Sequence, residues 1–559
     1  MSTTIVTQAG LRTGARLLVE SLEAQGVKHI FGIPGAKIDK VFDTLLDSSI
    51  QTIVCRHEQN AAFIAGGIGR MTGKAGVVLV TSGPGVSNLA TGLATATSEG
   101  DPVVAIGGAV PTERALKQVH QSMDQVGLLR PVTKFSAEIE SADTINEVVA
   151  NAFRIAESGR PGAAYINARQ DIIVGETHGE VLTPVTPAAP GSAEVSAITE
   201  AATLINRAQR PVVLLGLLAS QPNNSEAVRE LLGKVRLPVV ATYQAAGVVP
   251  RGLFDLYGGR IGLFRTQPAD RLLDDADLVV TVGFDPVEYE PSLWNKGRNR
   301  NLIHIDTVLS DIDRDYRPNI ELTGDIAATL RALAGKLKVR TLTSEKALLD
   351  EIAHERADFA KMAAAMNGTP IHPLRLVHEL QKLVSEDVTL CSDMGSFHIW
   401  IARYLYSFRP RQVLITNGQQ TLGVALPWAI AASLVRPNEK VISVSGDGGF
   451  LFSAMELETA VRLKCNLVHI VWIDGSYDMV RFQEMAKYGR ASAVEFGPVD
   501  VVKYADAFGA HGMHIQTPDE IAPTLKKAMA MQGPVLIGIP VDYSENHRLM
   551  EGLHPNVLV

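Results

Sequence analysis

The chain has 559 residues, enough for about three domains of ~150–200 residues each. Hydrophobic residues make up 46% and charged residues 20% of it, so the sequence can bury large cores and is not of the disordered class. Its formal net charge of −8 argues against nucleic acid as a partner, because proteins that bind nucleic acid need a basic surface.

Cysteine usage and hydropathy point to a compartment. The three cysteines, Cys55, Cys391 and Cys465, form neither a disulfide framework nor a metal-type cluster, which fits a reducing environment. The first residues lack the apolar core of a signal peptide. No apolar run reaches the ~18 residues that a membrane span needs. We therefore expect a cytoplasmic protein without a membrane association.

Strands and helices alternate through residues 1–175, which we expect to form the first domain. After a helix at 11–27, the apolar runs HIFGI, TIVC, GVVLV and PVVAI each end in a turn, and helical segments separate them. Such alternation is typical of a parallel sheet that is covered on both faces.

Two further domains are expected. Residues 176–194 are rich in Pro, Thr and Ala, lack periodicity, and read as a linker. A second α/β domain follows over 195–340, with strands in RPVVLLG, LPVVAT, ADLVVTVG and NLIHID. A charged helical stretch at 326–366 leads into a third domain at 365–545, and the final residues form a tail. The predicted fold class is α/β, with three domains that are each a parallel-sheet α/β sandwich.

A faint internal similarity links the first and third domains. Residues 77–88, VVLVTSGPGVSN, resemble residues 441–453, VISVSGDGGFLFS, in their order of strand, turn and small residues. Two interpretations stay open. The domains are versions of one fold, or the likeness is the general one between strands that end in a glycine turn.

The third domain carries two aspartates at the ends of successive apolar runs. Asp447 ends VISVSGD and Asp474 ends LVHIVWID, with one helical segment between them. In a parallel βαβ unit both strand ends lie on the same edge, so the two carboxylates can converge. Carboxylates beside glycine amides suit a hard cation and a phosphate. The alternative is that each is an ordinary turn aspartate.

Several common site motifs are missing from the sequence. There is no Walker A loop and no G-x-G-x-x-G that opens a helix after the first strand of a domain, which disfavours a nicotinamide site. No His/Cys grouping has zinc spacing, and there is no G-x-S-x-G elbow. The acidic, glycine-rich pattern of the third domain is therefore the main functional signal.

Six segments of the expected first and third domains carry specific motifs, and the resemblance that they support covers nearly the whole chain. The segments are RHEQNAAFIAGGIGR, GPGVSN, SDMGSFHIW, NGQQTLGVALPWAI, SGDGGF and YDMVRFQE. Together they resemble the thiamine diphosphate-dependent enzymes, and within that family the acetolactate synthases, the catabolic acetoin-forming type more than the biosynthetic type. The resemblance implies a transferase that decarboxylates pyruvate and ligates the two-carbon fragment to a second pyruvate, giving 2-acetolactate and carbon dioxide. Two alternatives stay open: a biosynthetic acetohydroxyacid synthase catalytic subunit and an FAD-dependent pyruvate oxidase.

The resemblance also implies a metal and diphosphate site. Mg²⁺ would be held by the carboxylates of Asp447 and Asp474 and by the backbone oxygen of Ser476, with diphosphate oxygens and a water completing an octahedron. The family often has Asn where this chain has Asp474, which leaves the preferred metal open. The implied cofactor-binding positions around the metal are Gly395, Ser396, Phe397, Asp447, Gly448, Gly449, Ser476 and Tyr477.

Four residues match family positions around the reactive end of the cofactor. Glu58 matches the glutamate that hydrogen-bonds N1′ of the aminopyrimidine and so promotes loss of the C2 proton of the thiazolium. Leu422 matches the bulky apolar residue that bends the cofactor into a V. Gln420 would offer its backbone carbonyl to the 4′ amine, and Met479 would form an apolar wall. Without the motifs, Leu422 and Met479 would be explained as core packing, and Glu58 as a carboxylate at a helix N-terminus.

Three residues are implied in substrate handling. Gln121 matches a family position that contacts the reaction intermediate. Gln483 stands where biosynthetic relatives carry Trp, so the apolar platform for the extra methyl group of 2-ketobutyrate is missing. Pyruvate is therefore expected as both donor and acceptor. Lys37 is either a carboxylate partner or a solvated surface lysine.

The resemblance extends to FAD and to subunit assembly. The stretch ATYQAAGVVPRGLFDLYGGRIGLF departs from the glycine- and methionine-rich pattern of FAD-containing synthases, so no functional FAD is expected. In the family, the pyrimidine end of the cofactor binds the first domain of one subunit and the diphosphate end binds the third domain of another. We therefore expect a homodimer or homotetramer with active sites between subunits.

Overall fold

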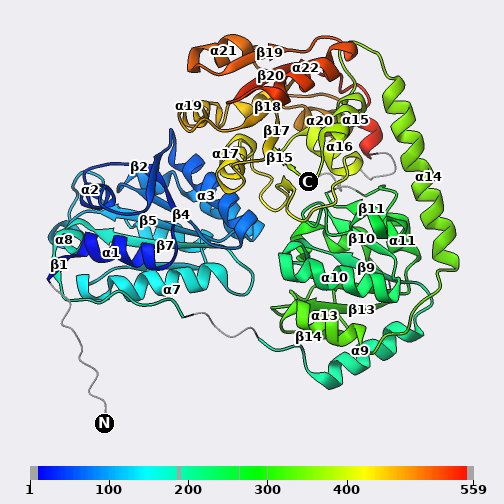
Figure 1. Ribbon diagram of the computed structural model, residues 1–559, viewed down its shortest axis with the longest axis horizontal. Helices are drawn as coiled ribbons and strands as arrows, with labels where there is room; N and C mark the ends of the chain where they lie inside the picture. Colours follow the sequence, from blue (N-terminus) through cyan, green and yellow to red (C-terminus); the bar gives the residue numbers. More distant parts are fainter. Residues whose placement is uncertain (1–10, 186–189, 264, 299, 551–559) are drawn as a thin grey trace. The chain divides into compact units, whose positions relative to one another are not determined.

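A computed structural model of the protein describes residues 11–185, 190–263, 265–298 and 300–550. It divides into two compact units, Met1–Pro187 with Ile430–Val435, and Ala188–Ala429 with Arg436–Val559 (Figure 1). The first unit is built on the expected first domain, and the second contains the other two. Residues 186–189 of the expected linker and 551–559 of the expected tail lie outside the described residues.

Six parallel strands form the sheet of the first domain, in the order β3-β2-β4-β5-β7-β6. They are β2 (His29–Ile33), β3 (Gln51–Val54), β4 (Gly76–Val80), β5 (Val103–Ala109), β6 (Phe135–Glu138) and β7 (Ala163–Arg169). The helices are α1 (Gly14–Ala24), α2 (Asp39–Leu45), α3 (Glu58–Thr72), α4 (Pro84–Ser87), α5 (Ala90–Glu99), α6 (Gln125–Leu129), α7 (Ile145–Glu157) and α8 (Gln170–Val174). The core on one face is built with α1, α2 and α7, while α3 and α5 pack together against the sheet as well. A short antiparallel pair, β1 (Arg12–Thr13) with β8 (Glu176–Thr177), extends this domain into the expected linker.

Helix α3 packs unusually tightly because of its small residues. A Cβ atom on Gly69 would lie 2.3 Å from the carbonyl oxygen of Pro102. A Cβ on Gly92 of α5 would lie 2.4 Å from the Cβ of Ala62. Distances under 3 Å leave no room for a side chain, so the backbone of α3 is fixed against its neighbours.

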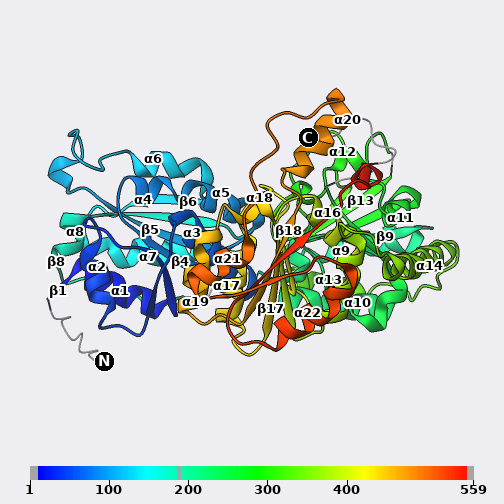
Figure 2. The same cartoon turned by 90° about the horizontal axis from the view of Figure 1, so that it is seen from above.

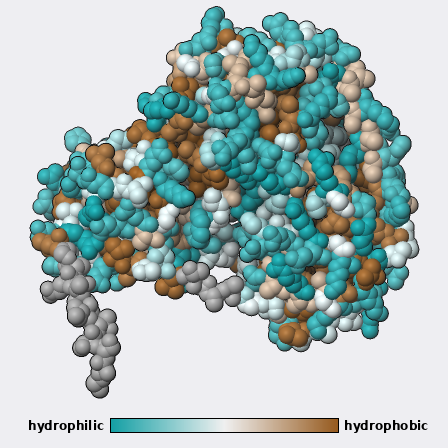
Figure 3. Space-filling model, viewed as in Figure 1, coloured by the Kyte–Doolittle hydropathy of each residue, from teal (hydrophilic) through white to brown (hydrophobic). Residues whose placement is uncertain are grey.

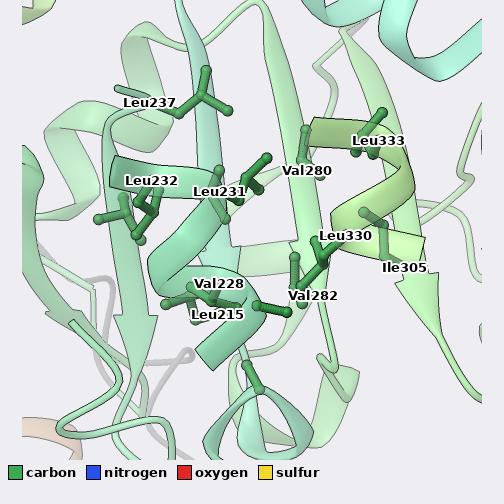
Figure 4. Close-up of a cluster of buried hydrophobic side chains, with 14 of the residues drawn as sticks. Leu215, Val228, Leu231, Leu232, Leu237, Val280, Val282, Ile305, Leu330 and Leu333 are labelled. Atoms are coloured by element: carbon green, nitrogen blue, oxygen red, sulfur yellow. The ribbon is translucent and has the colours of Figure 1, made fainter. Parts of the chain in front are cut away.

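The central domain has a parallel sheet in the order β11-β10-β9-β12-β13-β14. Its strands are β9 (Pro211–Leu215), β10 (Val239–Thr242), β11 (Tyr257–Ile261), β12 (Leu278–Val282), β13 (Asn301–Asp306) and β14 (Ile320–Thr323). Its helices are α9 (Val195–Arg207), α10 (Pro222–Val235), α11 (Asp270–Asp275), α12 (Pro291–Trp294) and α13 (Ile326–Ala334). Figure 4 shows leucine, isoleucine and valine side chains of α10 and α13 meeting those of β9, β12 and β13 in the buried core. This core explains why the apolar runs of the sequence become central strands.

The third domain follows the long helix α14 (Ser344–Ala365). Its parallel sheet has the order β16-β15-β17-β18-β20-β19, formed by β15 (Val388–Ser392), β16 (Val413–Ile415), β17 (Lys440–Gly446), β18 (Leu467–Ile473), β19 (His511–His514) and β20 (Val535–Pro540). Figure 2 labels two of these strands, β17 and β18. Its helices are α15 (Pro373–Leu383), α16 (Ser396–Tyr404), α17 (Ala425–Val435), α18 (Asp447–Phe450), α19 (Leu457–Arg462), α20 (Asp478–Tyr488), α21 (Val501–Phe508) and α22 (Pro518–Ala530). Three parallel-sheet α/β domains are therefore present, as the sequence predicted.

The first and third sheets have the same strand order when their strands are numbered along the chain. The similar segments 77–88 and 441–453 contain β4 and β17, which are the third of the six sheet strands in their respective domains. Of the two interpretations of the internal similarity, the structure supports two versions of one fold.

The described residues contain no helix that could span a membrane. The face drawn in Figure 3 is mostly hydrophilic, with apolar residues in small groups.

Candidate active site

Three aspartates lie at the carboxyl-terminal edge of the third-domain sheet. Asp393 follows β15, Asp447 follows β17 and Asp474 follows β18. These three strands are neighbours and run parallel, so their carboxyl ends lie side by side. The spacing of the sequence predicted this convergence for Asp447 and Asp474. Asp393 was quoted within a motif but not singled out.

The carboxylate of Asp447 ties the loops after β17 and β18 together. Its Oδ2 accepts hydrogen bonds from the backbone amides of Gly475 at 2.8 Å and Asp474 at 3.2 Å. Its Oδ1 accepts one from the amide of Gly448 at 3.0 Å. Ser476 donates its hydroxyl proton to Oδ2 of Asp474. The two carboxylates are thus held next to each other by the turns that carry them.

The electrostatics of this pair favour a bound cation. Burial raises the pKa of Asp447, and backbone amides oppose that shift. Burial also raises the pKa of Asp474 to about 7, with further upward contributions from the charges of Asp447 and Asp478. Crowded carboxylates repel each other when ionised, and a divalent cation between them would remove that repulsion.

The donor set is incomplete without a ligand. Among the described residues, no group of three or more His, Cys, Asp and Glu side chains could hold a metal ion by itself. Mg²⁺ is usually held by one or two carboxylates together with substrate phosphates and water. Asp447, Asp474 and the backbone oxygen of Ser476 are therefore a donor set that fits Mg²⁺ together with a diphosphate.

Two glycines allow the loops at this edge to approach each other. A Cβ on Gly448 would lie 2.7 Å from the ring of Tyr477. Gly395 has φ +153° at the start of α16, and a Cβ there would lie 2.6 Å from the ring of Phe397. A side chain at either position would displace an aromatic ring, so the close packing of the backbone at this edge depends on glycine.

The side chains of Ser396 and Phe397, at the start of α16, contact other parts of the third domain. Ser396 donates to Oδ2 of Asp478 at 2.5 Å, and Asn546 donates to the same oxygen. The Phe397 ring is 2% exposed and packs edge-on against Trp472, with ring centroids 5.8 Å apart. Any contact of Phe397 with a ligand would therefore come from its backbone.

Asp393 connects the loop after β15 to the loop that holds Leu422. Its carboxylate accepts hydrogen bonds from the amides of Met394 at 2.9 Å and Gly423 at 2.8 and 3.0 Å. Burial raises its pKa to about 7. A Cβ on Gly449 would lie 3.2 Å from this carboxylate and 3.7 Å from Leu422. The signal that could have found Asp393 is its place directly after an apolar strand, as for Asp447 and Asp474.

The other third-domain candidates lie in the loop after β16 and on α20. Gln420 is exposed and has φ +49°. Met479 packs against the third-domain core, and Gln483 lies one turn further along the same side of α20, half-buried. Val480 and Met485 of this helix are 48% and 49% exposed.

Glu58 begins α3 at the carboxyl-terminal edge of the first-domain sheet. It is 9% exposed, and Asn88 donates to its Oε2 at 2.9 Å. Its Oε1 lies 3.7 Å from where a Cβ of Gly85 would be, so no side chain fills that space. The ring of His57 caps the helix by accepting from the amide of Gln59. Asn88 is a site residue that the sequence reasoning missed, although it lies in the quoted segment GPGVSN.

Amide side chains surround the neighbouring turn of the first domain. Ser82 donates to Oε1 of Gln121 at 3.1 Å. The amide of Gly83 donates to Oε1 of Gln125 at 2.8 Å, and Gln125 is 2% exposed. Lys37 follows β2, the strand between β3 and β4, and is half-buried. Glu58, Gln121 and Lys37 thus lie at one edge of one sheet.

The central domain has its own strand-order reversal, between β9 and β12, where doubly wound sheets commonly bind dinucleotides. Here the buried carboxylate of Glu288 occupies that position. It accepts from the amide of Leu217 at 2.9 and 3.0 Å, from the hydroxyl of Thr242 at 2.5 Å and from the amide of Asp285 at 3.0 Å. A Cβ on Gly216 would lie 2.7 Å from its Oε1. Burial raises the pKa of Glu288 to about 7.

Comparison with known proteins agrees with this arrangement. Models of the thiamine pyrophosphate enzyme N-terminal TPP binding domain, central domain and C-terminal TPP binding domain match residues 12–128, 198–333 and 393–539. The catabolic acetolactate synthase of Raoultella terrigena is 54% identical, over 97% of both chains. The acetolactate synthase of Bacillus subtilis (strain 168) is 52% identical, over 96% of this chain and 94% of the relative. The acetolactate synthase isozyme 2 large subunit of Escherichia coli (strain K12) is 32% identical, over 95% of this chain and 96% of the relative. The chain therefore belongs to the acetolactate synthase family of thiamine pyrophosphate enzymes.

Proposed function

We propose that the protein is an acetolactate synthase that decarboxylates one pyruvate and joins the remaining two-carbon unit to a second pyruvate, releasing carbon dioxide and 2-acetolactate. The observation that carries this function is the full-length relation to catabolic acetolactate synthase, with 54% identity over 97% of both chains. Thiamine diphosphate, when bound, supplies the nucleophilic carbon and the electron sink for decarboxylation.

The first domain would handle the proton that activates the cofactor. Glu58 is nearly buried, and one of its oxygens is held by the side-chain amide of Asn88. The other oxygen, Oε1, lies 3.7 Å from where a Cβ of Gly85 would be, and it is the oxygen that would meet the ring nitrogen of the cofactor. A carboxylate fixed in this way can accept and return a proton without moving. We assign Glu58 as the proton-exchanging group and Asn88 as its positioning residue.

The third domain would hold the diphosphate and Mg²⁺. Asp447, held by the amides of Gly448 and Gly475, would bind the metal together with Asp474 and the backbone oxygen of Ser476. Gly448 and Gly449, which carry no side chain, would let the diphosphate approach the backbone. Leu422, next to Gly449, would support the bent cofactor from below. The close packing of these loops excludes water from one side of the cofactor.

Substrate selection would rest on amide and cationic side chains. Gln483 and Met479 share one side of α20, so the apolar wall and the hydrogen-bonding group lie one helical turn apart. Gln483 would bind the carboxylate of the acceptor pyruvate, and Gln121 would contact the donor. Lys37 would complete the neutralisation of a substrate carboxylate.

An active site formed between two copies of the chain would use both sets of groups. Apolar side chains are exposed close in sequence to both: Leu116 at 103% and Met123 at 42% in the first domain, and Val480 at 48% and Met485 at 49% on α20. Exposed apolar groups beside functional residues are typical of surfaces that a partner covers. We infer a homodimer or homotetramer, which sedimentation of the purified protein would test.

The central domain would function without FAD. The carboxylate of Glu288 uses the amide of Leu217 and the hydroxyl of Thr242, at the strand reversal where a dinucleotide phosphate would need such donors. A buried negative charge also repels a phosphate. We therefore propose that purified protein carries no flavin absorbance and that added FAD leaves turnover unchanged. Flavin-dependent oxidation of pyruvate would contradict this.

The decisive experiment is product analysis with purified protein, thiamine diphosphate and Mg²⁺. Pyruvate alone should give acetolactate and carbon dioxide in equal amounts, and leaving out either cofactor should abolish the product. An equimolar mixture of pyruvate and 2-ketobutyrate should give mainly acetolactate. No acetolactate from pyruvate would refute the function, and a preference for 2-ketobutyrate as acceptor would identify a biosynthetic enzyme instead.

A further inference from the structure

A cavity lies in the second unit, beside the edge strand β11 and under α14. Its volume is about 990 Å³, the size of many small-molecule sites. It is lined by β11, α11, α14, α15 and the chain segment after α16. None of the residues proposed to hold thiamine diphosphate or substrate lines it. We propose that this cavity binds an organic anion, a phosphate or carboxylate carried on a flat aromatic body.

Arg260 is the central residue of this site. It lies on β11, lines the cavity and is only 4% exposed. Neither of its terminal guanidinium nitrogens has a hydrogen-bond partner among the described residues. An ionised group that is buried without a partner costs free energy, and an anion in the cavity would supply the missing acceptors.

Nearby groups do not neutralise Arg260. Burial raises the pKa of Tyr257 to about 12, although the charge of Arg260 and a side-chain interaction between the two groups oppose that shift. The phenol of Tyr257 is therefore uncharged at neutral pH. The lining contains six arginines and three acidic side chains. Asp274 forms an ion pair with Arg265, and Glu355 forms one with Arg271. Asp270 accepts the hydroxyl of Tyr289 and interacts electrostatically with Arg265 and Arg403. The guanidinium of Arg260 is therefore available to bind an anionic ligand.

Two more arginines of the lining donate hydrogen bonds to backbone oxygens, and Arg403 also lies near the buried carboxylate of Asp270. Arg356 donates to the backbone oxygen of Tyr257 at 3.1 Å. Arg403 donates to the backbone oxygens of Arg265 at 3.2 Å and Leu549 at 3.1 Å. A carbonyl oxygen orients a guanidinium but carries no net charge. Arg260, Arg356 and Arg403 therefore give the cavity an excess of positive charge.

Aromatic rings define the second half of the ligand. The guanidinium carbon of Arg356 lies 4.8 Å from the ring centroid of Tyr406 and 4.6 Å from that of Phe254. That of Arg260 lies 5.9 Å from Tyr406. Arg251 stacks on Phe408 at 3.7 Å. Alternating guanidinium and aromatic groups can stack a flat ring while binding its acidic group, and this combination is unsuited to a neutral aliphatic ligand.

The test uses the holoenzyme, saturated with thiamine diphosphate and Mg²⁺ so that the diphosphate loops are occupied. Phenyl phosphate and benzoate are titrated by calorimetry, with neutral phenol and inorganic phosphate as comparisons. We expect one site per chain for at least one aromatic anion, and at least tenfold weaker binding of phenol and of inorganic phosphate. The tighter of the two aromatic anions identifies the acidic group.

Two variants assign the site. Arg260→Met should weaken binding of the aromatic anion at least tenfold, and Arg356→Met should weaken it in the same direction. The matched control Arg331→Met removes an exposed arginine of α13 that pairs with Glu230, and it should bind as the wild type does. Acetolactate formation without added anion should be unchanged in Arg260→Met.

Thermal unfolding separates this proposal from a purely structural role of Arg260. If the guanidinium of Arg260 serves to bind a ligand, removing it should not destabilise the protein alone. In the absence of the anion, Arg260→Met should therefore unfold at the same temperature as the wild type or at a higher one. Adding the anion should raise the unfolding temperature of the wild type but not that of Arg260→Met. Equal affinity of Arg260→Met and wild type, binding of phenol as tight as that of phenyl phosphate, or no binding of either aromatic anion would overturn the proposal. Should Arg260→Met fail to fold, Arg356→Met is judged by the same outcomes.

Discussion

In the first domain, the turn after β4 runs through Ser82 and Gly83, and the neutral side chains of Gln121 and Gln125 hold it. In the third domain, the turn after the matching strand β17 begins with Asp447. The two sheets have the same strand order, so the backbone delivers both turns to equivalent places. The difference lies in charge.

That difference explains how one fold can bind opposite ends of one cofactor. The third-domain edge gathers carboxylates that need a cation and so suits a metal with a diphosphate. The first-domain edge offers one nearly buried carboxylate, Glu58, among amides, which suits proton exchange with a neutral ring. The topology fixes where loops lie, and a few side chains decide what each loop does.

The largest effect is expected when the proton-exchanging group of the first domain is neutralised. Glu58→Gln keeps the shape and the contact with Asn88, so thiamine diphosphate should still bind through the third domain. Turnover should fall about 10²–10⁴-fold because the amide cannot accept the proton. Steady-state acetolactate formation and cofactor binding by fluorescence measure the two properties. The control Glu113→Gln changes an exposed carboxylate of the same domain. Wild-type turnover of Glu58→Gln would remove the assigned difference between the two edges.

Neutralising the third-domain edge should affect the metal instead. Asp447→Asn removes one ligand charge and should weaken the apparent affinity for Mg²⁺ about 10–100-fold, with activity partly restored at high Mg²⁺. Activity measured against the Mg²⁺ concentration checks this. Asp519→Asn, on the exposed side of α22, is the matched control. An unchanged Mg²⁺ dependence would mean that the two edges do not divide the work as proposed.

The central domain has a buried carboxylate too, that of Glu288, and its hydrogen bonds stabilise the fold. The pKa of Glu288 is about 7 in the folded protein, against about 4.3 in an unfolded chain. The folded state therefore binds more protons between these values, and its free energy of unfolding should fall as pH rises from about 4 to about 7. Glu288→Gln should flatten this dependence, by roughly 3 kcal/mol over the interval.

Denaturant unfolding at several pH values measures that slope. The control Glu290→Gln alters an exposed carboxylate two residues away and should keep the wild-type profile. If Glu288→Gln retains the wild-type slope, the carboxylate of Glu288 is not the group that senses pH in this interval.

The smallest effect concerns the choice of acceptor. Gln483→Trp should place an apolar surface on α20 and shift the acceptor preference towards 2-ketobutyrate by about tenfold, at the lower end of the ~1–3 kcal/mol that one methylene is worth. Chromatography of the two acetohydroxy acids formed in competition measures the ratio. Gln516→Trp, exposed elsewhere in the third domain, should leave the ratio unchanged. The same ratio in Gln483→Trp would count against Gln483 as the residue that reads the acceptor.

Much of the fold could be predicted from the sequence because apolar runs of strand length alternate with helical segments in all three domains. The pairing of Asp447 with Asp474 followed from one βαβ spacing. The strand orders could not be predicted, since they depend on which crossovers pass which face of the sheet. The sequence did not predict the roles of Asn88 and Asp393, because each depends on a hydrogen bond to a residue 30 positions away in the chain. The partner of Asn88 is Glu58, and that of Asp393 is Gly423.

The buried position of Glu288 could not be predicted from the sequence for the same reason. Its partners, Leu217 and Thr242, lie 71 and 46 residues away along the chain. Only the packed central sheet brings the three together. A buried acid with partners so distant has no local pattern that a sequence can display.

The close packing of α3 limits which substitutions the protein can tolerate. Gly69 and Gly92 touch no proposed ligand, yet a methyl group at either would lie within 2.4 Å of the neighbouring backbone or side chain. The helix would then have to shift, and Glu58 begins that helix. A saturation-mutagenesis library selected for acetolactate production should therefore be as depleted at these two glycines as at Glu58. Variation should instead collect on exposed positions of the same helix, such as Thr72.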